Sequence, residues 1–212
     1  MTRIKICGLT RMEDILAVNL LRPDYIGFVF AKSRRQIDGE GAKRLKKYLH
    51  PSIQAVGVFV NGDLEWEAEL FRQGIIDGIQ LHGQEDEETV QRLKRLTKKV
   101  TGREACIIKA VSMDHVQELE VWQESMADYL LLDNGAGGSG RAFDHRILHA
   151  KEIKKPFFLA GGVTPQNAAE LAGTYHPFAL DSSSGVETDG VKDKDKIRQI
   201  IEAVRERKAA GR

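Results

Sequence analysis

The sequence has few cysteines, no long hydrophobic run and almost no net charge. Its two cysteines, Cys7 and Cys106, could form one disulfide at most, and no secretory hydrophobic region opens the chain. We therefore expect reduced thiols and a cytoplasmic protein. No stretch approaches the ~18 consecutive apolar residues that a membrane helix needs, so we expect no membrane partner.

The balance of charge argues against a second class of partner. The 32 basic and 31 acidic side chains leave a formal net charge of +1, so no overall charge attracts nucleic acid or an anionic membrane. Any site for an anion must therefore be local. The 212 residues are 42% hydrophobic, which predicts one globular domain over residues 1–212 with a substantial core.

Short apolar runs alternate with longer amphipathic stretches along the chain. This alternation predicts parallel strands joined by right-handed helical crossovers, and nearly continuous apolar strands indicate burial on both faces. Eight such units predict a closed (β/α)₈ TIM barrel. The predicted strands are 3–7, 25–30, 55–60, 76–82, 105–110, 129–132, 157–160 and 178–180.

A doubly wound open sheet shows the same local alternation and is the main structural alternative. Open sheets that bind dinucleotides carry a glycine-rich turn after their first strand. Here Cys7 is followed by Gly8, Leu9 and Thr10, which do not form that turn. The barrel is therefore favoured.

Four predicted strands end in side chains that can carry out chemistry. Cys7 ends the first strand, His82 the fourth, Asp133 the sixth and Asp181 the eighth. The carboxyl ends of the strands form the catalytic face of a TIM barrel, so we expect a thiol, an imidazole and two carboxylates at one mouth. A thiolate there can act as a general base or a nucleophile.

Each of these side chains also has a structural interpretation. Asp133 precedes an Asn-Gly pair and could hold that turn, and Asp181 precedes three serines and could cap a turn or helix. His82 and Cys7, each taken alone, are more often structural. We expect Cys106 to be an inert buried thiol. It is the set of four that favours a site.

Turns rich in glycine or serine follow the last three predicted strands, at 135–140, 161–163 and 183–185. The last two predict a phosphate site, because free backbone N–H groups and a short helix, here 184–187, bind anions there in many barrels. A tight turn before a helix with Thr164 as its cap and Pro165 as its first residue is the alternative for 161–163. The loop 135–140 suits a lid, or is simply a mobile loop.

A basic cluster at 32–35 follows the second predicted strand. The planar fork of arginine suits a carboxylate, so the cluster indicates a substrate that carries a carboxylate as well as a phosphate, on opposite sides of the mouth. A solvated run of surface charge is the alternative.

Six motifs together resemble one family, phosphoribosylanthranilate isomerase of tryptophan biosynthesis. They occur in the family's order over almost the whole chain, which makes the resemblance far more specific than any single motif. The motifs are Lys-Ile-Cys-Gly at 5–8, Gly-Phe-Val-Phe at 27–30, Gln-Leu-His-Gly at 80–83, Gly-Gly-Ser-Gly at 137–140, Leu-Ala-Gly-Gly-Val-Thr-Pro-Gln-Asn at 159–167 and Asp-Ser-Ser-Ser-Gly-Val-Glu at 181–187.

The resemblance implies an isomerase that needs neither cofactor nor metal. Its reaction would be the Amadori rearrangement of N-(5'-phosphoribosyl)anthranilate to 1-(2-carboxyphenylamino)-1-deoxyribulose 5-phosphate. The partner is then a small phosphorylated substrate, and the enzyme is a monomer or a homodimer. It implies Asp133 as general acid, Cys7 as general base and Arg35 as the group that binds the anthranilate carboxylate. The other expected substrate-binding residues are His82 and Asp181, and the expected phosphate-binding residues are Gly138, Gly140, Gly161, Gly162, Ser183, Ser184 and Gly185.

An aldose-to-ketose shift needs one group that gives a proton and another that takes one, and Asp133 and Cys7 form such a pair. The thiol should then have a lowered pKa. Lys5 lies two residues before Cys7 and points to the same side of the strand, so its ammonium could favour the thiolate, or form a structural ion pair inside the barrel. His145 stands where the family usually has tryptophan, and its role stays open.

Two other functions fit part of this pattern. A sugar isomerase of histidine biosynthesis, or a barrel that serves both pathways, performs the same rearrangement on a larger substrate with two phosphates. Such barrels resemble this one but use an aspartate where Cys7 stands, and the chain lacks their repeated half-barrels. A non-catalytic sensor of phosphorylated ligands would need the phosphate loops but not the acid and the base.

Overall fold

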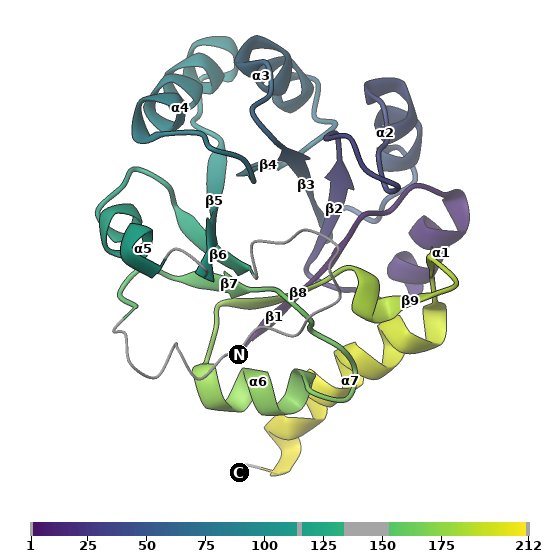
Figure 1. The fold of residues 1–212 in the computed structure, drawn as a ribbon. Helices are drawn as coiled ribbons and strands as arrows, with labels where there is room; N and C mark the ends of the chain where they lie inside the picture. Colours follow the sequence, from purple (N-terminus) through teal and green to yellow (C-terminus); the bar gives the residue numbers. More distant parts are fainter. Residues whose placement is uncertain (1, 114–115, 134–152, 211–212) are drawn as a thin grey trace.

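The computed structural model describes residues 2–113, 116–133 and 153–210, with the backbone alone at 116 and over 206–210. Eight parallel strands close into a barrel because β8 pairs with β1 as well as with β7 (Figure 1). The predicted TIM barrel is confirmed. The strands are β1 (Arg3–Cys7), β2 (Tyr25–Val29), β3 (Gln54–Phe59), β4 (Gly78–Leu81), β5 (Cys106–Ser112), β6 (Tyr129–Asp133), β7 (Phe157–Leu159) and β8 (Ala179–Ser182).

Helices surround the barrel in the described part of the chain (Figure 1). They are α1 (Met12–Leu21), α2 (Gly39–Lys46), α3 (Leu64–Arg72), α4 (Glu87–Thr101), α5 (Val116–Gln123), α6 (Ala168–Tyr175) and α7 (Lys194–Ala210). A 3₁₀ turn, η3 (Ser184–Val186), and a small hairpin of β9 (Glu187–Thr188) and β10 (Val191–Lys192) lie between β8 and α7. The short helix predicted at 184–187 is therefore present as η3.

Side chains along a strand alternate between two apolar layers. In β6, Leu130 and Leu132 belong to the large cluster that the strands form with the helices, whereas Leu131 belongs to a small cluster with residues such as Phe158 from β7. Ile197 in α7 is part of the large cluster. Burial on both faces explains why the strands appear in the sequence as nearly continuous apolar runs.

Three aspartates stabilise the end of the barrel that lies opposite the predicted mouth. Each directly precedes a strand, and each carboxylate accepts a hydrogen bond from the backbone of the preceding strand. Asp24 accepts from the N–H of Ile4 at 2.9 Å, and Asp128 accepts from the N–H of Ile107 at 2.7 Å. Asp77 accepts from the N–H of Ala55 at 2.7 Å. β4 begins at Gly78, directly after this aspartate, and not at the predicted residue 76.

The helix start given as the alternative for the turn at 161–163 is wrong. That alternative placed Thr164 as the cap of a helix beginning at Pro165, but the helix begins at Ala168 with Asn167 at its N-cap position. The Asn167 side chain accepts a hydrogen bond from the N–H of Thr164 at 2.8 Å and donates to the carbonyl of Gly162 at 2.9 Å. These bonds stabilise a turn over 165–167, which delays the helix. Within the described ranges, no helix is both long and apolar enough to cross a membrane.

Candidate active site

Cys7 lies at the carboxyl end of β1, and it is 8% exposed. A Cβ on Gly27 of β2 would come within 2.5 Å of its Sγ, so the glycine leaves the space that the thiol fills. Lys5, two residues earlier and fully buried, forms an ion pair with Asp181 on β8, with 2.7 Å between Nζ and Oδ2. The strand register places Lys5 directly beside Asp181.

Both interpretations of Lys5 hold, because it forms the ion pair inside the barrel and its ammonium also favours the thiolate of Cys7. The ion pair inside the barrel is present, and Asp181 uses its carboxylate there rather than as a helix cap. Its second oxygen, Oδ1, is buried and has no hydrogen-bond partner within the part of the chain that is described. Burying an acceptor without a partner costs free energy, so Oδ1 is available to a ligand hydroxyl.

The electrostatics of Cys7 differ from the prediction. Burial raises the pKa of the thiol above its ordinary value, and the ammonium groups of Lys5 and Lys192 oppose this rise without cancelling it. The expected lowering of its pKa is therefore wrong. Burial opposes the charge on Lys5 too, but Asp181 and Cys7 raise its pKa above the ordinary value. Cys106 is a free thiol whose pKa burial raises to about 12, in keeping with an inert residue.

Asp133 and His82 meet at the mouth of the barrel. Asp133 ends β6, and its Oδ2 is 3.4 Å from Nε2 of His82, which directly follows β4. The amide nitrogen of Gln80 lies 2.8 Å from Nδ1 of the same ring. With that nitrogen as donor, the proton of a neutral His82 ring lies on Nε2 and faces the carboxylate. Both residues line a cavity of about 260 Å³ that Lys109 and Trp122 also line.

The loops after β7 and β8 pack directly on each other. Gly161 and Gly162 have φ angles of +75° and +83°, a conformation that favours glycine. A Cβ on Gly185 would lie 2.0 Å from the carbonyl oxygen of Val163, so only glycine fits there. The hydroxyl of Ser182 donates to the same carbonyl at 2.7 Å.

The second of these loops is also tied to the base of the site. The hydroxyl of Ser183 donates to the carbonyl of Cys7 at 3.0 Å, so the loop after β8 begins beside the thiol. Ser184 and Gly185 follow within η3. The phosphate site stays a prediction. Gly138, Gly140 and the loop 135–140 lie outside the described residues, as does His145.

The basic cluster after β2 is held by a carboxylate that the sequence did not single out. Arg35 binds Glu187 of β9 through two hydrogen bonds, Nε to Oε1 at 2.7 Å and Nη2 to Oε2 at 3.0 Å. Arg34 binds Oε2 as well, at 2.6 Å, and Lys192 of β10 binds Oε1 at 2.6 Å. The two arginines are therefore not merely a run of solvated charge.

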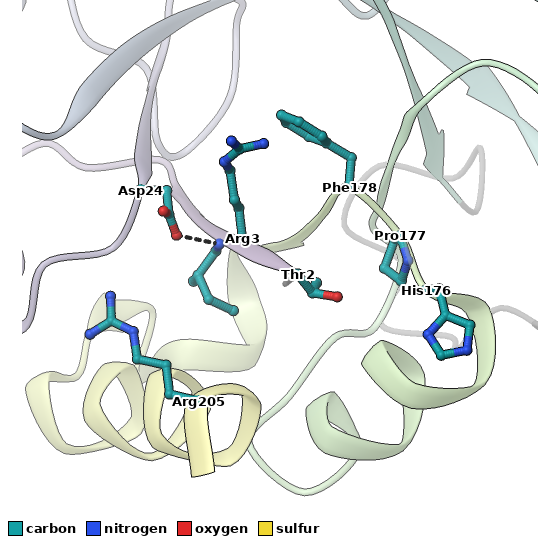
Figure 2. A pocket seen from close by; sticks show the side chains of 8 residues that line it. Thr2, Arg3, Asp24, His176, Pro177, Phe178 and Arg205 are labelled. Atoms are coloured by element: carbon teal, nitrogen blue, oxygen red, sulfur yellow. Dashed lines mark hydrogen bonds between the residues drawn. The ribbon is translucent and has the colours of Figure 1, made fainter. Parts of the chain in front are cut away.

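A second cavity, of about 690 Å³, lies at the other end of the barrel (Figure 2). Arg3 begins β1, and its guanidinium lies 4.3 Å from the centre of the Phe178 ring, while Asp24 and Arg205 lie on another side. Catalytic residues of TIM barrels lie at the carboxyl ends of the strands. This cavity, at their amino ends, is therefore not the candidate active site.

A family model described as "N-(5'phosphoribosyl)anthranilate (PRA) isomerase" matches residues 4–203. The chain belongs to this isomerase family. It is similar to the N-(5'-phosphoribosyl)anthranilate isomerases of Acetivibrio thermocellus, with 43% identity over 97% of each chain, and of Endomicrobium trichonymphae, with 44% identity over 97% of this chain and 99% of the relative.

Solved structures of the isomerase family have the same fold. The phosphoribosyl anthranilate isomerase of Thermus thermophilus is 33% identical with a TM-score of 0.82, covering 97% of this chain and 99% of the other. A second such isomerase, solved in complex with reduced 1-(o-carboxyphenylamino)-1-deoxyribulose 5-phosphate, is 32% identical with a TM-score of 0.82, covering 97% and 100%.

Sequence reasoning did not single out Glu187 and Lys192, which in this isomerase contact the expected site residues Arg35 and Ser183. Glu187 ends the motif that begins at Asp181, and Lys192 follows an Asp-Gly pair at 189–190 that is typical of a hairpin turn. That turn signal predicts that the chain folds back after η3. The hairpin brings Lys192 beside Glu187, where burial lowers the pKa of Lys192 although Glu187 opposes the change.

Proposed function

We propose that this chain catalyses the Amadori rearrangement of N-(5'-phosphoribosyl)anthranilate to 1-(2-carboxyphenylamino)-1-deoxyribulose 5-phosphate in tryptophan biosynthesis, and that it does so in the cytoplasm. Family membership supports the reaction. The observation that carries the proposal is the convergence of a thiol on β1, a carboxylate on β6 and two interlocked loops after β7 and β8 at one end of the barrel.

Asp133 is the proposed general acid. It gives a proton to the ring oxygen of the ribose while the bond from that oxygen to C1 breaks, and the lone pair of the anthranilate nitrogen forms the C1=N iminium. His82, 3.4 Å away, then faces the carboxylate that the transfer leaves behind. A hydrogen bond from Nε2 would stabilise that carboxylate, and a histidine in this position also limits the orientations open to Asp133.

Cys7 is the proposed general base. Its thiolate takes the proton from C2, the C–H electrons form the C1=C2 bond, and the iminium electrons return to nitrogen. The resulting enol of C2 becomes the ketone when C1 gains a proton and the C2 hydroxyl loses one, so no proton is gained or lost overall and the reaction is an isomerisation. Because burial raises the pKa of the thiol, the ammonium groups of Lys5 and Lys192 have the task of keeping a usable fraction of thiolate.

The remaining residues bind the two anionic ends of the substrate. Backbone N–H groups of Gly161 and Gly162, together with Ser183, Ser184 and Gly185, bind the phosphate, to which Gly138 and Gly140 also contribute in this proposal. Arg35 binds the anthranilate carboxylate. Asp181 accepts a hydrogen bond from a substrate hydroxyl through Oδ1, which is the oxygen that Lys5 leaves without a partner.

The test is turnover by the unaltered protein. Phosphoribosylanthranilate is fluorescent and is generated just before use, so its consumption is followed as loss of fluorescence. We expect rapid loss that is proportional to protein concentration, and no turnover of the isomerase substrate of histidine biosynthesis. Binding without turnover would indicate a sensor, and turnover of the histidine precursor in place of phosphoribosylanthranilate would indicate the other pathway.

A further inference from the structure

Glu187 is the buried centre of a charge cluster at the edge of the site. Its side chain is 4% exposed and its two oxygens are shared by Arg34, Arg35 and Lys192 at 2.6 to 3.0 Å. Burial works against ionisation, but hydrogen bonds from Arg35 and Lys192 lower the pKa of Glu187 to about 2. Three cations around one carboxylate leave an excess of positive charge, which suits an anionic ligand.

The way Arg35 binds Glu187 leaves part of its guanidinium for a ligand. Nε and Nη2 bind the carboxylate side-on. A guanidinium has five N–H donors, so the two on Nη1 and one on Nη2 stay directed away from Glu187. That edge has the fork geometry that binds a second carboxylate through two parallel hydrogen bonds.

The stem of Arg35 is fixed as well. A Cβ on Gly8 would come within 2.4 Å of Cδ of Arg35, so the arginine crosses the backbone directly after Cys7. Glu187 binds the guanidinium of Arg35, and the aliphatic part of the same side chain packs against Gly8. Arginine loses much side-chain entropy when a ligand orders it, and a carboxylate that orders it beforehand reduces that cost.

Lys192 connects this cluster to the predicted phosphate loop. Its ammonium group donates to the carbonyl of Ser183 at 2.9 Å as well as to Glu187. Ser183 in turn donates to the carbonyl of Cys7. One chain of hydrogen bonds therefore joins Arg35, Glu187, Lys192, Ser183 and the strand that carries the thiol.

We propose that Glu187 is a positioning residue that holds Arg35 ready for the carboxylate of the substrate, and so sets the preference for an aryl amine that bears a carboxylate. The inference rests on the proposed function, in which Arg35 binds that group. Glu187 acts through Arg35 and does not itself touch the substrate.

The test compares two ligands that differ only in the carboxylate. The first is the reduced product analogue, reduced 1-(o-carboxyphenylamino)-1-deoxyribulose 5-phosphate, and the second is the same molecule with phenyl in place of carboxyphenyl. Dissociation constants are measured by calorimetry for the wild type and Glu187→Gln. We expect Glu187→Gln to weaken binding of the first ligand about tenfold and of the second less than twofold.

The matched control is Glu69→Gln on the outer helix α3, where Glu69 also binds an arginine, Arg72. It should bind both ligands as the wild type does. In an Arg35→Met background, Glu187→Gln should cause no further loss for the carboxylate ligand, because the two residues act as a unit. If Glu187→Gln does not fold, Glu187→Asp, which keeps the charge but shortens the side chain, should show the same selective loss.

Equal weakening of both ligands in Glu187→Gln would overturn the proposal, because it would mean that Glu187 supports the loop after β8 rather than Arg35. An additive loss in the Arg35→Met background would also overturn it. Failure of the proposed function looks different, since the wild type would then not turn over phosphoribosylanthranilate, whether or not it binds the carboxylate ligand.

Discussion

Replacing Glu67 by glutamine should stabilise the protein at neutral and alkaline pH. Glu67 lies on α3, is fully buried, and neither oxygen of its carboxyl group has a hydrogen-bond partner within the described residues. Burial, together with the nearby carboxylates of Glu85 and Asp63, raises its pKa to about 8. In the folded protein Glu67 is therefore mostly a neutral acid at pH 7.

The direction of this pH effect follows from the difference in proton affinity of Glu67 between the folded and unfolded states. A carboxyl group whose pKa is higher in the folded state binds its proton more tightly there, so stability is lost as pH rises above the unfolded value. The ordinary pKa of Glu67 is 4.5 and its folded value is about 8. At about 1.4 kcal/mol per unit of difference, the wild type loses roughly 3 kcal/mol between pH 4.5 and 7, and the loss levels off above pH 8. Glutamine does not ionise and avoids this loss.

The assay is urea denaturation of wild type and Glu67→Gln at pH 5, 6, 7, 8 and 9. The difference in unfolding free energy should increase with pH up to about pH 8, in favour of the variant. Glu69→Gln, on the same helix but with its pKa lowered to about 2 by hydrogen bonds from Arg72 and Gln73, should show no such increase. A difference for Glu67→Gln that stays constant from pH 5 to pH 9 would refute the reasoning.

Three further predictions concern the site. Lys5→Met should destabilise the protein by about 3–5 kcal/mol because it leaves Asp181 charged and buried. The double variant Lys5→Met, Asp181→Asn should recover part of that loss in the same urea assay. Full stability of the single variant would contradict this prediction. Gly185→Ala should raise the KM for the phosphorylated substrate at least tenfold, because its Cβ has no space beside the loop after β7. The control Gly39→Ala, whose Cβ meets only ordinary contacts, should leave KM unchanged. Equal KM values for the two variants would count against a phosphate site formed by the packed loops after β7 and β8. Since the pKa of Cys7 is raised, kcat/KM should increase from pH 7 into the alkaline range as the thiolate forms, and a flat profile would argue against a thiolate base.

The sequence predicts the barrel well because its signals are local. Each strand is an apolar run that both layers bury, and the run that ends at Cys7 coincides with β1 at both ends. The start of α6 was missed because Pro165 suits both a first helical turn and an ordinary turn. The choice between them depends on the Asn167 side chain, which bonds backward to Thr164 and Gly162.

The site is predictable only in part, because its energetics depend on distant residues. The ends of the predicted strands identify Cys7 and Asp133 as candidate site residues. The contact between Arg35 and Glu187, in contrast, joins residues 152 positions apart. No local pattern indicates such a pair. The raised pKa of Cys7 likewise comes from the depth of its burial, which the spacing of Lys5 and Cys7 does not reveal.

The most direct test of the account is the rate of phosphoribosylanthranilate turnover by four folded proteins: wild type, Cys7→Ala, Asp133→Asn and the control Cys106→Ala. General acid–base groups contribute typically 10²–10⁴-fold to a rate. We expect the rate to fall on the order of 10³-fold in Cys7→Ala and Asp133→Asn. The rate of Cys106→Ala should be unchanged, because its thiol has no role in the proposed reaction. A rate within tenfold of wild type in either of the first two variants would contradict the assignment of Cys7 and Asp133 as the proton-transfer pair.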